Sequence, residues 1–255
     1  MREKIAVGVL GATGTVGQRF IERLVRHPWF ELVAVAASDR SEGKTYGEAA
    51  RWRLASELPE EIAGMTVSAT GPDLPCRIIF SALDAATARE VEPRCAQAGQ
   101  FVFSNAAAHR MDEDVPLLIP EVNADALELL DCQRRRRGWR GALVANANCS
   151  TMFLAMALHP LHRAFVVRRA FVSTMQAVSG AGYPGVASLD ILGNVIPDIS
   201  GEAEKMESET RKILGDLEDG AVRPAAMALS AMTHRVPVED GHLEAVSAGF
   251  VRPAS

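Results

Sequence analysis

The chain has 255 residues and a formal net charge of −5. Apolar residues make up 48% of it and charged residues 23%, which is the balance of a globular protein and excludes disorder as a description of the whole chain. The acidic balance argues against a dedicated nucleic-acid-binding protein, and no apolar run approaches the roughly 20 residues that cross a bilayer. We therefore expect neither nucleic acid nor a membrane as a partner, and the short apolar stretch 5–10 is not expected to act as a signal peptide.

The N-terminal region predicts a strand, a glycine-rich turn, a helix and a second strand. Residues 4–10 are an apolar run with β-branched side chains, which favours a buried strand. A helix is expected over 15–27, because apolar residues recur every four positions there and Pro28 follows. A second buried strand is expected over 31–37. This order predicts a parallel sheet.

The alternation of strands and helices continues along the next part of the chain. Strands are expected over 77–82, 101–104 and 142–145, and helices over 84–98, 124–137 and 151–163, where Pro160 would shorten the last helix.

Beyond residue 163 the strands become longer and the crossover helices fewer. Strands are expected over 166–178 and 243–251, with a helix over 201–217 between them. This pattern predicts a second domain of the α+β type with a mostly antiparallel sheet. The predicted fold class is therefore α/β, with a Rossmann-type domain over 1–148 followed by an α+β domain over 149–255.

Four consecutive arginines at 134–137 end one predicted helix. A nucleic-acid-binding patch is one interpretation. A solvated helix end is favoured, because cations are stabilised at a helix C-terminus and the chain as a whole is acidic.

Glycines at positions 8, 11, 14 and 17 surround the turn between the first strand and the first helix. Glycine lets the backbone turn tightly and approach a pyrophosphate, which then lies at the positive end of the helix. The context of strand, turn and helix is the one that a dinucleotide site requires, although a glycine turn without a ligand is the alternative. The residues expected to contact the cofactor are Gly11, Thr13, Gly14, Thr15 and Val16.

The residues after the second predicted strand bear on the choice of cofactor. Ser38, Arg40 and Ser41 offer hydroxyl groups and a cation, which suit the 2′-phosphate of NADP. Asp39 would suit the ribose hydroxyls of NAD, so NAD stays as the minority alternative.

Four cysteines are scattered along the chain, and one of them lies between a predicted strand and a predicted helix. At a helix N-terminus the dipole and the backbone N–H groups stabilise a thiolate, so we expect the pKa of Cys149 to fall and its sulfur to act as a nucleophile. Cys76, Cys95 and Cys132 lack such a position, and we expect them to be reduced packing residues of a cytoplasmic protein.

A nucleophilic thiol beside a nicotinamide site indicates one reaction class. The thiolate takes an acyl group as a thioester, and hydride reduces the thioester to an aldehyde. Such a site needs an acid/base for the oxygen of the intermediate and cations for an anionic substrate.

Six motifs in order resemble aspartate-semialdehyde dehydrogenase, in its archaeal and fungal branch. They are GVLGATGTVGQ at 8–18, SNAAAHRM at 104–111, NANCST at 146–151, MQAVSGAG at 175–182, GEAEKMESETRKIL at 201–214 and HRVPVEDGH at 234–242. The match begins near residue 4 and runs to the end of the chain.

The resemblance implies roles for the residues in these motifs. Cys149 matches the nucleophile that attacks aspartyl phosphate, His242 the acid/base of the hydride step, and Gln176 the residue that orients the acyl-enzyme. Arg235 matches the arginine that grips the substrate carboxylate, a task that suits its two-pronged guanidinium group.

The resemblance also implies the remaining contacts. Glu202 would take the substrate amino group, Lys205 would face the same pocket, and Arg110 with Asn105 would complete the phosphate site. Gly180 joins the cofactor-binding residues. No metal ion is implied.

Structural interpretations compete with these roles. His242 would be an ordinary turn histidine, Arg235 a surface residue, and Glu202 with Lys205 a solvated helix pair; Glu204 competes with Glu202 as the ligand. His109, His159 and His162 are expected to be structural.

The resemblance carries expectations about the size and partners of the protein. Family members are longer and continue beyond the strand at 243–251, so we expect this chain to lack the C-terminal part of the second domain. A homodimer or homotetramer is expected. The expected activity is NADP-dependent reduction of aspartyl phosphate to aspartate semialdehyde in lysine, threonine and methionine biosynthesis. The alternatives are a malonyl- or succinyl-CoA reductase, and a non-catalytic NADP-binding or assembly partner.

Overall fold

The computed structural model describes residues 3–253, which form two compact units. The first unit runs to Pro116 and includes Leu129–Asn146, and the second takes Leu117–Glu128 and the chain from Ala147 onward. None of the helices formed by residues 3–253 has the length and apolar character needed to cross a membrane.

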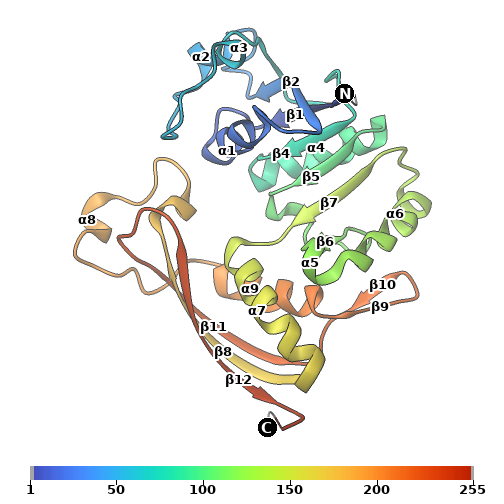
Figure 1. Ribbon diagram of the computed structural model, residues 1–255, viewed down its shortest axis with the longest axis vertical. Coiled ribbons are helices and arrows are strands. Elements are labelled where there is room, and N and C mark those ends of the chain that lie inside the picture. The colour runs from blue at the N-terminus through green and yellow to red at the C-terminus, as the bar shows by residue number, and fades with distance from the viewer. Residues whose placement is uncertain (1–2, 254–255) are drawn as a thin grey trace. The chain divides into compact units, whose positions relative to one another are not determined.

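The first unit is built on a large parallel sheet. Six strands lie in this unit in the order β3-β2-β1-β4-β5-β7, and the recorded pairings between neighbours are parallel. Figure 1 shows the succession from β2 to β7. The seventh strand of the sheet, β6 (Leu117–Leu118), falls in the stretch that belongs to the second unit. The six strands are β1 Ile5–Leu10, β2 Phe30–Ala37, β3 Val67–Ala69, β4 Ile78–Ser81, β5 Phe101–Ser104 and β7 Ala142–Asn146. The predicted Rossmann-type parallel sheet is confirmed.

Helices connect these strands and cover the sheet. They are α1 Thr15–Leu24, α2 Tyr46–Ala49, α3 Glu60–Ala63, α4 Ala85–Ala98, the 3₁₀ turn Ala107–His109 and α6 Leu129–Arg137. The apolar ends of β1 and β2 are buried, and side chains such as Val7, Ile21 and Val35 form one core cluster with α1. Both strands are nearly continuous apolar segments, because helices cover a parallel sheet on both faces.

Two of the helices predicted before residue 138 differ from those observed. The first ends at Leu24 rather than at residue 27, because Nδ1 of His27 accepts hydrogen bonds from the backbone N–H groups of Trp29 and Phe30 and turns the chain toward β2. The helix expected over 124–137 is a 3₁₀ turn, Ala124–Glu128, followed by α6.

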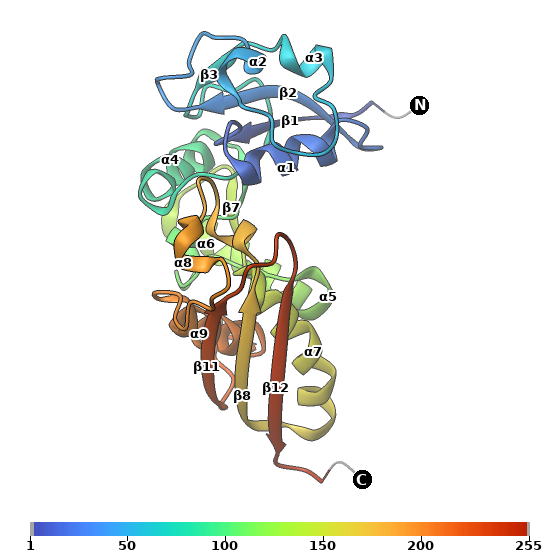
Figure 2. The ribbon, with the colours of Figure 1, turned by 90° about the vertical axis from the view of Figure 1, so that its left-hand side faces the viewer.

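The second unit contains a three-stranded sheet in the order β11-β8-β12. Figure 2 shows these strands side by side, with α7 and α9 packed behind them. The bounds are α5 Pro120–Asn123, α7 Cys149–Phe165, β8 Val167–Gln176, the 3₁₀ turn Val178–Ala181, α8 Ser188–Ile191, α9 Glu202–Ile213, the hairpin β9 Asp216–Glu218 and β10 Ala221–Arg223, β11 Ala228–Arg235 and β12 His242–Phe250.

Three expectations for this unit need correction. The sheet is mixed rather than mostly antiparallel: β12 is antiparallel to β8, but β11 is parallel to it, because the long connection through α9 returns the chain in the same direction. Helix α7 continues through Pro160 to Phe165. The helix expected over 201–217 ends at Ile213, where the chain turns into β9.

The core of the second unit joins α7 and α9 to the sheet. Leu154 and Leu158 of α7, Met206 of α9 and Val172 of β8 belong to one buried cluster. This cluster holds α7, whose first residue is Cys149, against the strands.

Replacing Leu154 with Ala should lower the free energy of unfolding by about 2–5 kcal/mol, because it leaves a cavity in this cluster. Met156→Ala on the same helix is the matched control, since Met156 is half exposed, and its effect should stay within about 0.5 kcal/mol. Urea titration followed by far-ultraviolet circular dichroism measures both. Equal losses in the two variants would contradict the assigned core.

Candidate active site

The turn that carries Cys149 is fixed by its neighbour Asn148. The side-chain oxygen of Asn148 accepts hydrogen bonds from the backbone N–H groups of Ser150 (2.9 Å) and Thr151 (3.3 Å) and so caps α7. Such a cap starts the helix at the cysteine itself, two residues earlier than expected. Cys149 therefore lies in the first turn of α7 and reaches the surface.

His242 is the closest functional partner of this thiol. It is the first residue of β12, and its Nε2 lies 3.2 Å from Sγ of Cys149. The other ring nitrogen, Nδ1, accepts a hydrogen bond of 3.1 Å from the backbone N–H of Ala177. The ring also meets the edge of the Phe153 ring on α7. The structure thus brings the predicted nucleophile and the predicted acid/base into contact.

The ends of β8 and β11 complete this side of the site. Gln176 and Arg235 are the last residues of these strands and are paired in register with each other. Both are buried, and Arg235 donates a hydrogen bond of 2.8 Å from Nη1 to the carbonyl oxygen of Ala177. A Cβ atom on Gly180 would lie 2.8 Å from Nη1 of Arg235 and 3.3 Å from Cε1 of His242. A side chain at position 180 would therefore displace the guanidinium group of Arg235.

Glu202 lies on the other side of the cysteine turn, at the start of α9. Its Oε1 accepts a hydrogen bond of 2.6 Å from the side-chain N–H of Asn148, and its Oε2 lies 3.6 Å from Nζ of Lys205. Glu202 is buried whereas Glu204 is exposed. Of the two competing acids, Glu202 is the one that faces the turn of Cys149.

A second acid on α9, Glu209, was not predicted from the sequence. Glu209 is buried, and its Oε2 accepts a hydrogen bond of 2.7 Å from the backbone N–H of Asn148. Its spacing of seven residues from Glu202 places both acids on one face of the helix, two turns apart. That spacing within the motif GEAEKMESETRKIL could have indicated it.

The expected drop in the pKa of Cys149 is wrong. Although Cys149 reaches the surface, neighbouring protein atoms remove part of the water around its thiol, and this desolvation raises its pKa. The negative charge of Glu202 raises it further, and the hydrogen bonds from Ser150 at the helix N-terminus lower it only in part. Burial also raises the pKa of Cys76 to about 11 and that of Cys95 to about 12, which fits packing residues.

Asn105 and Arg110, the residues expected at the phosphate site, lie in the first unit. Arg110 is buried and donates a hydrogen bond of 2.8 Å to the carbonyl oxygen of Asn105. The side-chain oxygen of Asn105 accepts one of 2.6 Å from Asn146, the last residue of β7. The two residues are therefore held together within one segment after β5.

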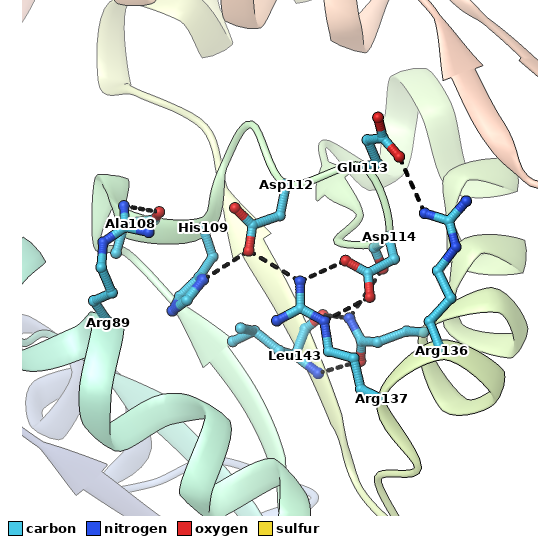
Figure 3. Close-up of polar contacts among 10 residues, drawn as sticks. Arg89, Ala108, His109, Asp112, Glu113, Asp114, Arg136, Arg137 and Leu143 are labelled. Carbon is cyan, nitrogen blue, oxygen red and sulfur yellow. Dashed lines mark hydrogen bonds and ion pairs between the residues drawn. The ribbon is translucent and has the colours of Figure 1, made fainter.

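The arginine run has a structural role that the sequence did not reveal. Figure 3 shows Arg137 between Asp112 and Asp114, with its Nη2 3.0 Å from Asp112 and its Nε 2.6 Å from Asp114. Asp112 also contacts Nδ1 of His109 at 2.9 Å. Only part of the run is a solvated helix end, because Arg137 ties α6 to the segment that follows Asn105 and Arg110.

The glycine turn fits a dinucleotide. Gly11 has a φ of +69°, and a Cβ there would lie 2.5 Å from the carbonyl oxygen of Ala82. Within the described chain, no side chain caps the N-terminus of α1 and no acidic residue lies in its first turn, which leaves the positive end of the helix to an anion. Ser38 and Arg40, just after β2, are exposed. Hydroxyl and guanidinium groups there suit a 2′-phosphate.

One unexpected feature lies two residues beyond His242. Glu244 pairs in register with Thr174 of β8, and its Oε1 is buried without a hydrogen-bond partner among the described residues. Burial raises the pKa of this carboxyl to about 7.

Comparison with known proteins agrees with these motifs. Two family models match the chain, the semialdehyde dehydrogenase NAD-binding domain over residues 6–130 and the semialdehyde dehydrogenase dimerisation domain over residues 158–255. The aspartate-semialdehyde dehydrogenase of Methanothermobacter thermautotrophicus is 55% identical over 95% of this chain and 70% of its own length. That of Archaeoglobus fulgidus is 49% identical over 99% of this chain and 74% of its own length.

The chain belongs to the aspartate-semialdehyde dehydrogenase family. Solved structures of the family agree in fold. The Candida albicans aspartate semialdehyde dehydrogenase, solved with NADP, superposes with a TM-score of 0.91 at 41% identity, over 99% of this chain and 74% of that one. Aspartate semialdehyde dehydrogenase II of Vibrio cholerae, complexed with ASA, gives a TM-score of 0.75 at 29% identity, over 99% and 76%. The predicted family is thereby confirmed.

Glu202→Gln should lower the pKa of Cys149, because it removes the negative charge and keeps an oxygen for the hydrogen bond from Asn148. Alkylation of Cys149 by iodoacetamide at pH 7.5 should become about two- to tenfold faster, since one pKa unit is a tenfold change in thiolate. Glu204→Gln on the same helix is the control and should leave the rate unchanged. If both variants react like the unmodified chain, Glu202 does not act on the thiol.

Glu244→Gln should stabilise the fold in a manner that depends on pH. The folded pKa is raised to about 7 from 4.5, so the contribution of the protonated carboxyl is present below about pH 4.5 and is lost as the pH rises through 7. The variant should gain at most about 3 kcal/mol at pH 8, and less where solvent reaches the group, with no gain near pH 4. Urea unfolding at the two pH values, with the exposed Glu239→Gln as control, measures this. The same gain at both pH values would refute the assignment.

Proposed function

We propose that this chain is an NADP-dependent aspartate-semialdehyde dehydrogenase, which reduces L-aspartyl 4-phosphate to L-aspartate 4-semialdehyde through a thioester on Cys149. The observation that carries the proposal is the contact between Cys149 and His242 at 3.2 Å, surrounded by Gln176, Arg235 and Glu202. The identity to curated family members supports the substrate.

Cys149 is the proposed nucleophile. The thiol first loses its proton to solvent water. The resulting thiolate Sγ attacks the acyl carbon of aspartyl phosphate, the C–S bond forms, and phosphate leaves with the electrons of the broken C–O bond. NADPH, when bound, supplies the hydride that reduces this thioester. Nε2 of His242 gives a proton to the oxygen of the carbon attached to Sγ and takes it back when the C–S bond breaks and the aldehyde leaves. Gln176, at the end of β8, would orient the acyl group.

The charged residues would hold the two ends of the substrate. The planar guanidinium of Arg235 would bind the α-carboxylate, because its fork matches two oxygens. Glu202 would accept the ammonium group, and Lys205, Arg110 and Asn105 would bind the phosphate. The rigid hydrogen bond from Arg235 to Ala177 O supports this role, since it leaves the orientation of the guanidinium fixed.

The cofactor would be held by the first unit. The residues that would hold NADP are Gly11, Thr13, Gly14, Thr15 and Val16 around the uncapped end of α1, with Ser38, Arg40 and Ser41 at the 2′-phosphate. Gly180 is proposed to contribute from the second unit. The exposed cation at Arg40 supports NADP over NAD.

A homodimer formed through the three-stranded sheet is part of the proposal. The sheet face opposite α7 and α9 exposes Phe171, Met175, Met232 and Leu243, each at least 47% exposed, around a shallow hollow of about 360 Å³. The dimerisation family model covers these strands. We place the protein in the cytoplasm, where its free thiols would stay reduced. The boundary between the domains is proposed at residue 148.

The activity is tested by mixing the 255-residue chain with aspartate semialdehyde, phosphate and NADP and following NADPH absorbance. NADPH should form, and Cys149→Ala should reduce the rate by at least about 10³-fold while NADP binding, measured by calorimetry, is retained. Turnover by Cys149→Ala would refute the thioester. If the chain is inactive with these substrates but oxidises NADPH with malonyl-CoA, the substrate assignment is wrong. Binding of NADP without either activity would identify a non-catalytic partner.

Met232→Asp should weaken the homodimer, because it places a carboxylate on the apolar sheet face, beside the hollow that Met232 lines. Sedimentation velocity should show a dimer or larger assembly for the unmodified chain and a shift toward monomer for the variant. Leu189→Asp is the control, since Leu189 is also exposed but lies outside this face. A monomeric unmodified chain would refute the proposed interface.

A further inference from the structure

A backbone contact determines which ring nitrogen of His242 carries a proton, and therefore what faces Sγ of Cys149. Nε2 of His242 lies 3.2 Å from Sγ, and Nδ1 lies 3.1 Å from the backbone nitrogen of Ala177. A backbone N–H can only donate a hydrogen bond, so Nδ1 must act as the acceptor. A neutral imidazole carries one N–H, which is therefore on Nε2 and points at Sγ.

The reverse orientation of the ring does not satisfy these contacts. Turning the ring over would place carbon atoms against both Sγ and the Ala177 nitrogen. Two independent partners thus define the orientation of His242, one on α7 and one directly after β8.

We propose that the backbone N–H of Ala177 locks His242 as the tautomer protonated on Nε2, so that the imidazole donates a hydrogen bond toward Sγ of Cys149. The inference rests on the proposed function in taking Cys149 as the nucleophile. Because Nε2 already carries a proton, it cannot accept the proton of the thiol. A thiolate–imidazolium pair would need a second proton on Nδ1, and that proton would point at the N–H of Ala177.

Arg235 also contacts Ala177 and so acts on the orientation of His242. Its Nη1 donates to the carbonyl oxygen of Ala177, whose N–H donates to His242. Ala177 is thus held on both sides of its α-carbon, in an extended conformation with φ −64° and ψ 154°. Arg235 is therefore a positioning residue for His242 as well as the proposed carboxylate ligand.

The other groups near the pair agree with a neutral thiol. Glu202 of α9 acts electrostatically on Cys149 and is itself 3.6 Å from Nζ of Lys205. Arg235 of β11 and the ring of His242 both lie against Gly180, and α7 contributes the uncharged Phe153. The negative charge of Glu202 acts against ionisation of Cys149. The proton on Nε2 is then available for the substrate oxygen in the reduction step, and ionisation of the thiol is a separate event.

Nuclear magnetic resonance of the chain labelled with ¹⁵N in its histidine rings tests the tautomer directly. The chain has six histidines, and His242→Asn identifies the signals of His242 by their loss. Between about pH 7 and pH 8, Nε2 should give the chemical shift of a protonated nitrogen and Nδ1 that of an unprotonated one. A ring protonated on Nδ1, or on both nitrogens, would overturn the proposal whether or not the chain is active.

The reactivity of the thiol gives a second readout, which distinguishes the proposed tautomer from a thiolate–imidazolium pair. The rate of alkylation by iodoacetamide is measured from pH 5.5 to 9.5, with Cys149→Ala subtracted for the other cysteines. The inflection should lie at or above the ordinary thiol value of about 8.5, and His242→Asn should change the rate at pH 6 less than threefold. A rate that stays high down to pH 6 and falls tenfold or more in His242→Asn would show a thiolate–imidazolium pair and refute the proposal.

Discussion

The site depends on how Asn148 is held. Its side chain caps α7, its side-chain N–H binds Glu202 and its backbone N–H binds Glu209. Each of these contacts fixes the residue directly before the nucleophile, and two of them come from one face of α9. Hydrogen bonds to charged acceptors are shorter and stronger than neutral ones. The hydrogen bonds from Asn148 to Glu202 and Glu209 are also buried, so loss of either acid would leave a buried N–H group of Asn148 without an acceptor.

The same arrangement decides the electrostatics of Cys149. A helix N-terminus stabilises a nearby negative charge by typically 0.3–1 kcal/mol at an exposed site. Partial desolvation of the exposed thiol and the charge of Glu202 oppose that effect, and the net result is a raised pKa for Cys149. The carboxylate that positions the cysteine turn thereby adds to the rise in the pKa of the thiol. Positioning and reactivity are coupled through one residue, since the proposed binding of a substrate ammonium to Glu202 would neutralise the charge that restrains the thiol.

The first unit solves a similar problem for the segment that carries Asn105 and Arg110. That segment follows β5 and contains only a short 3₁₀ turn, so contacts from other elements are needed to hold it. Arg137, at the end of α6, joins it through Asp112 and Asp114, and Asn146 at the end of β7 holds Asn105. These contacts come from elements that follow the segment by more than 20 residues in sequence.

The sequence by itself determined the parallel sheet, the glycine turn, the family and the candidate residues of the site, because these follow from local apolar runs and from motifs of fixed spacing. The strand β11 was not predicted, and its direction could not be, since Ala228–Arg235 shows no periodicity that distinguishes a parallel from an antiparallel neighbour. Nor could the sequence give the pKa of Cys149, because the helix start is local in sequence, whereas Glu202 and the atoms that bury the thiol arrive through tertiary packing. The contact of Glu209 with Asn148 and the lock on His242 also arise only through tertiary packing. The lock comes from a backbone N–H, which every residue except proline possesses, and only the fold decides where it points.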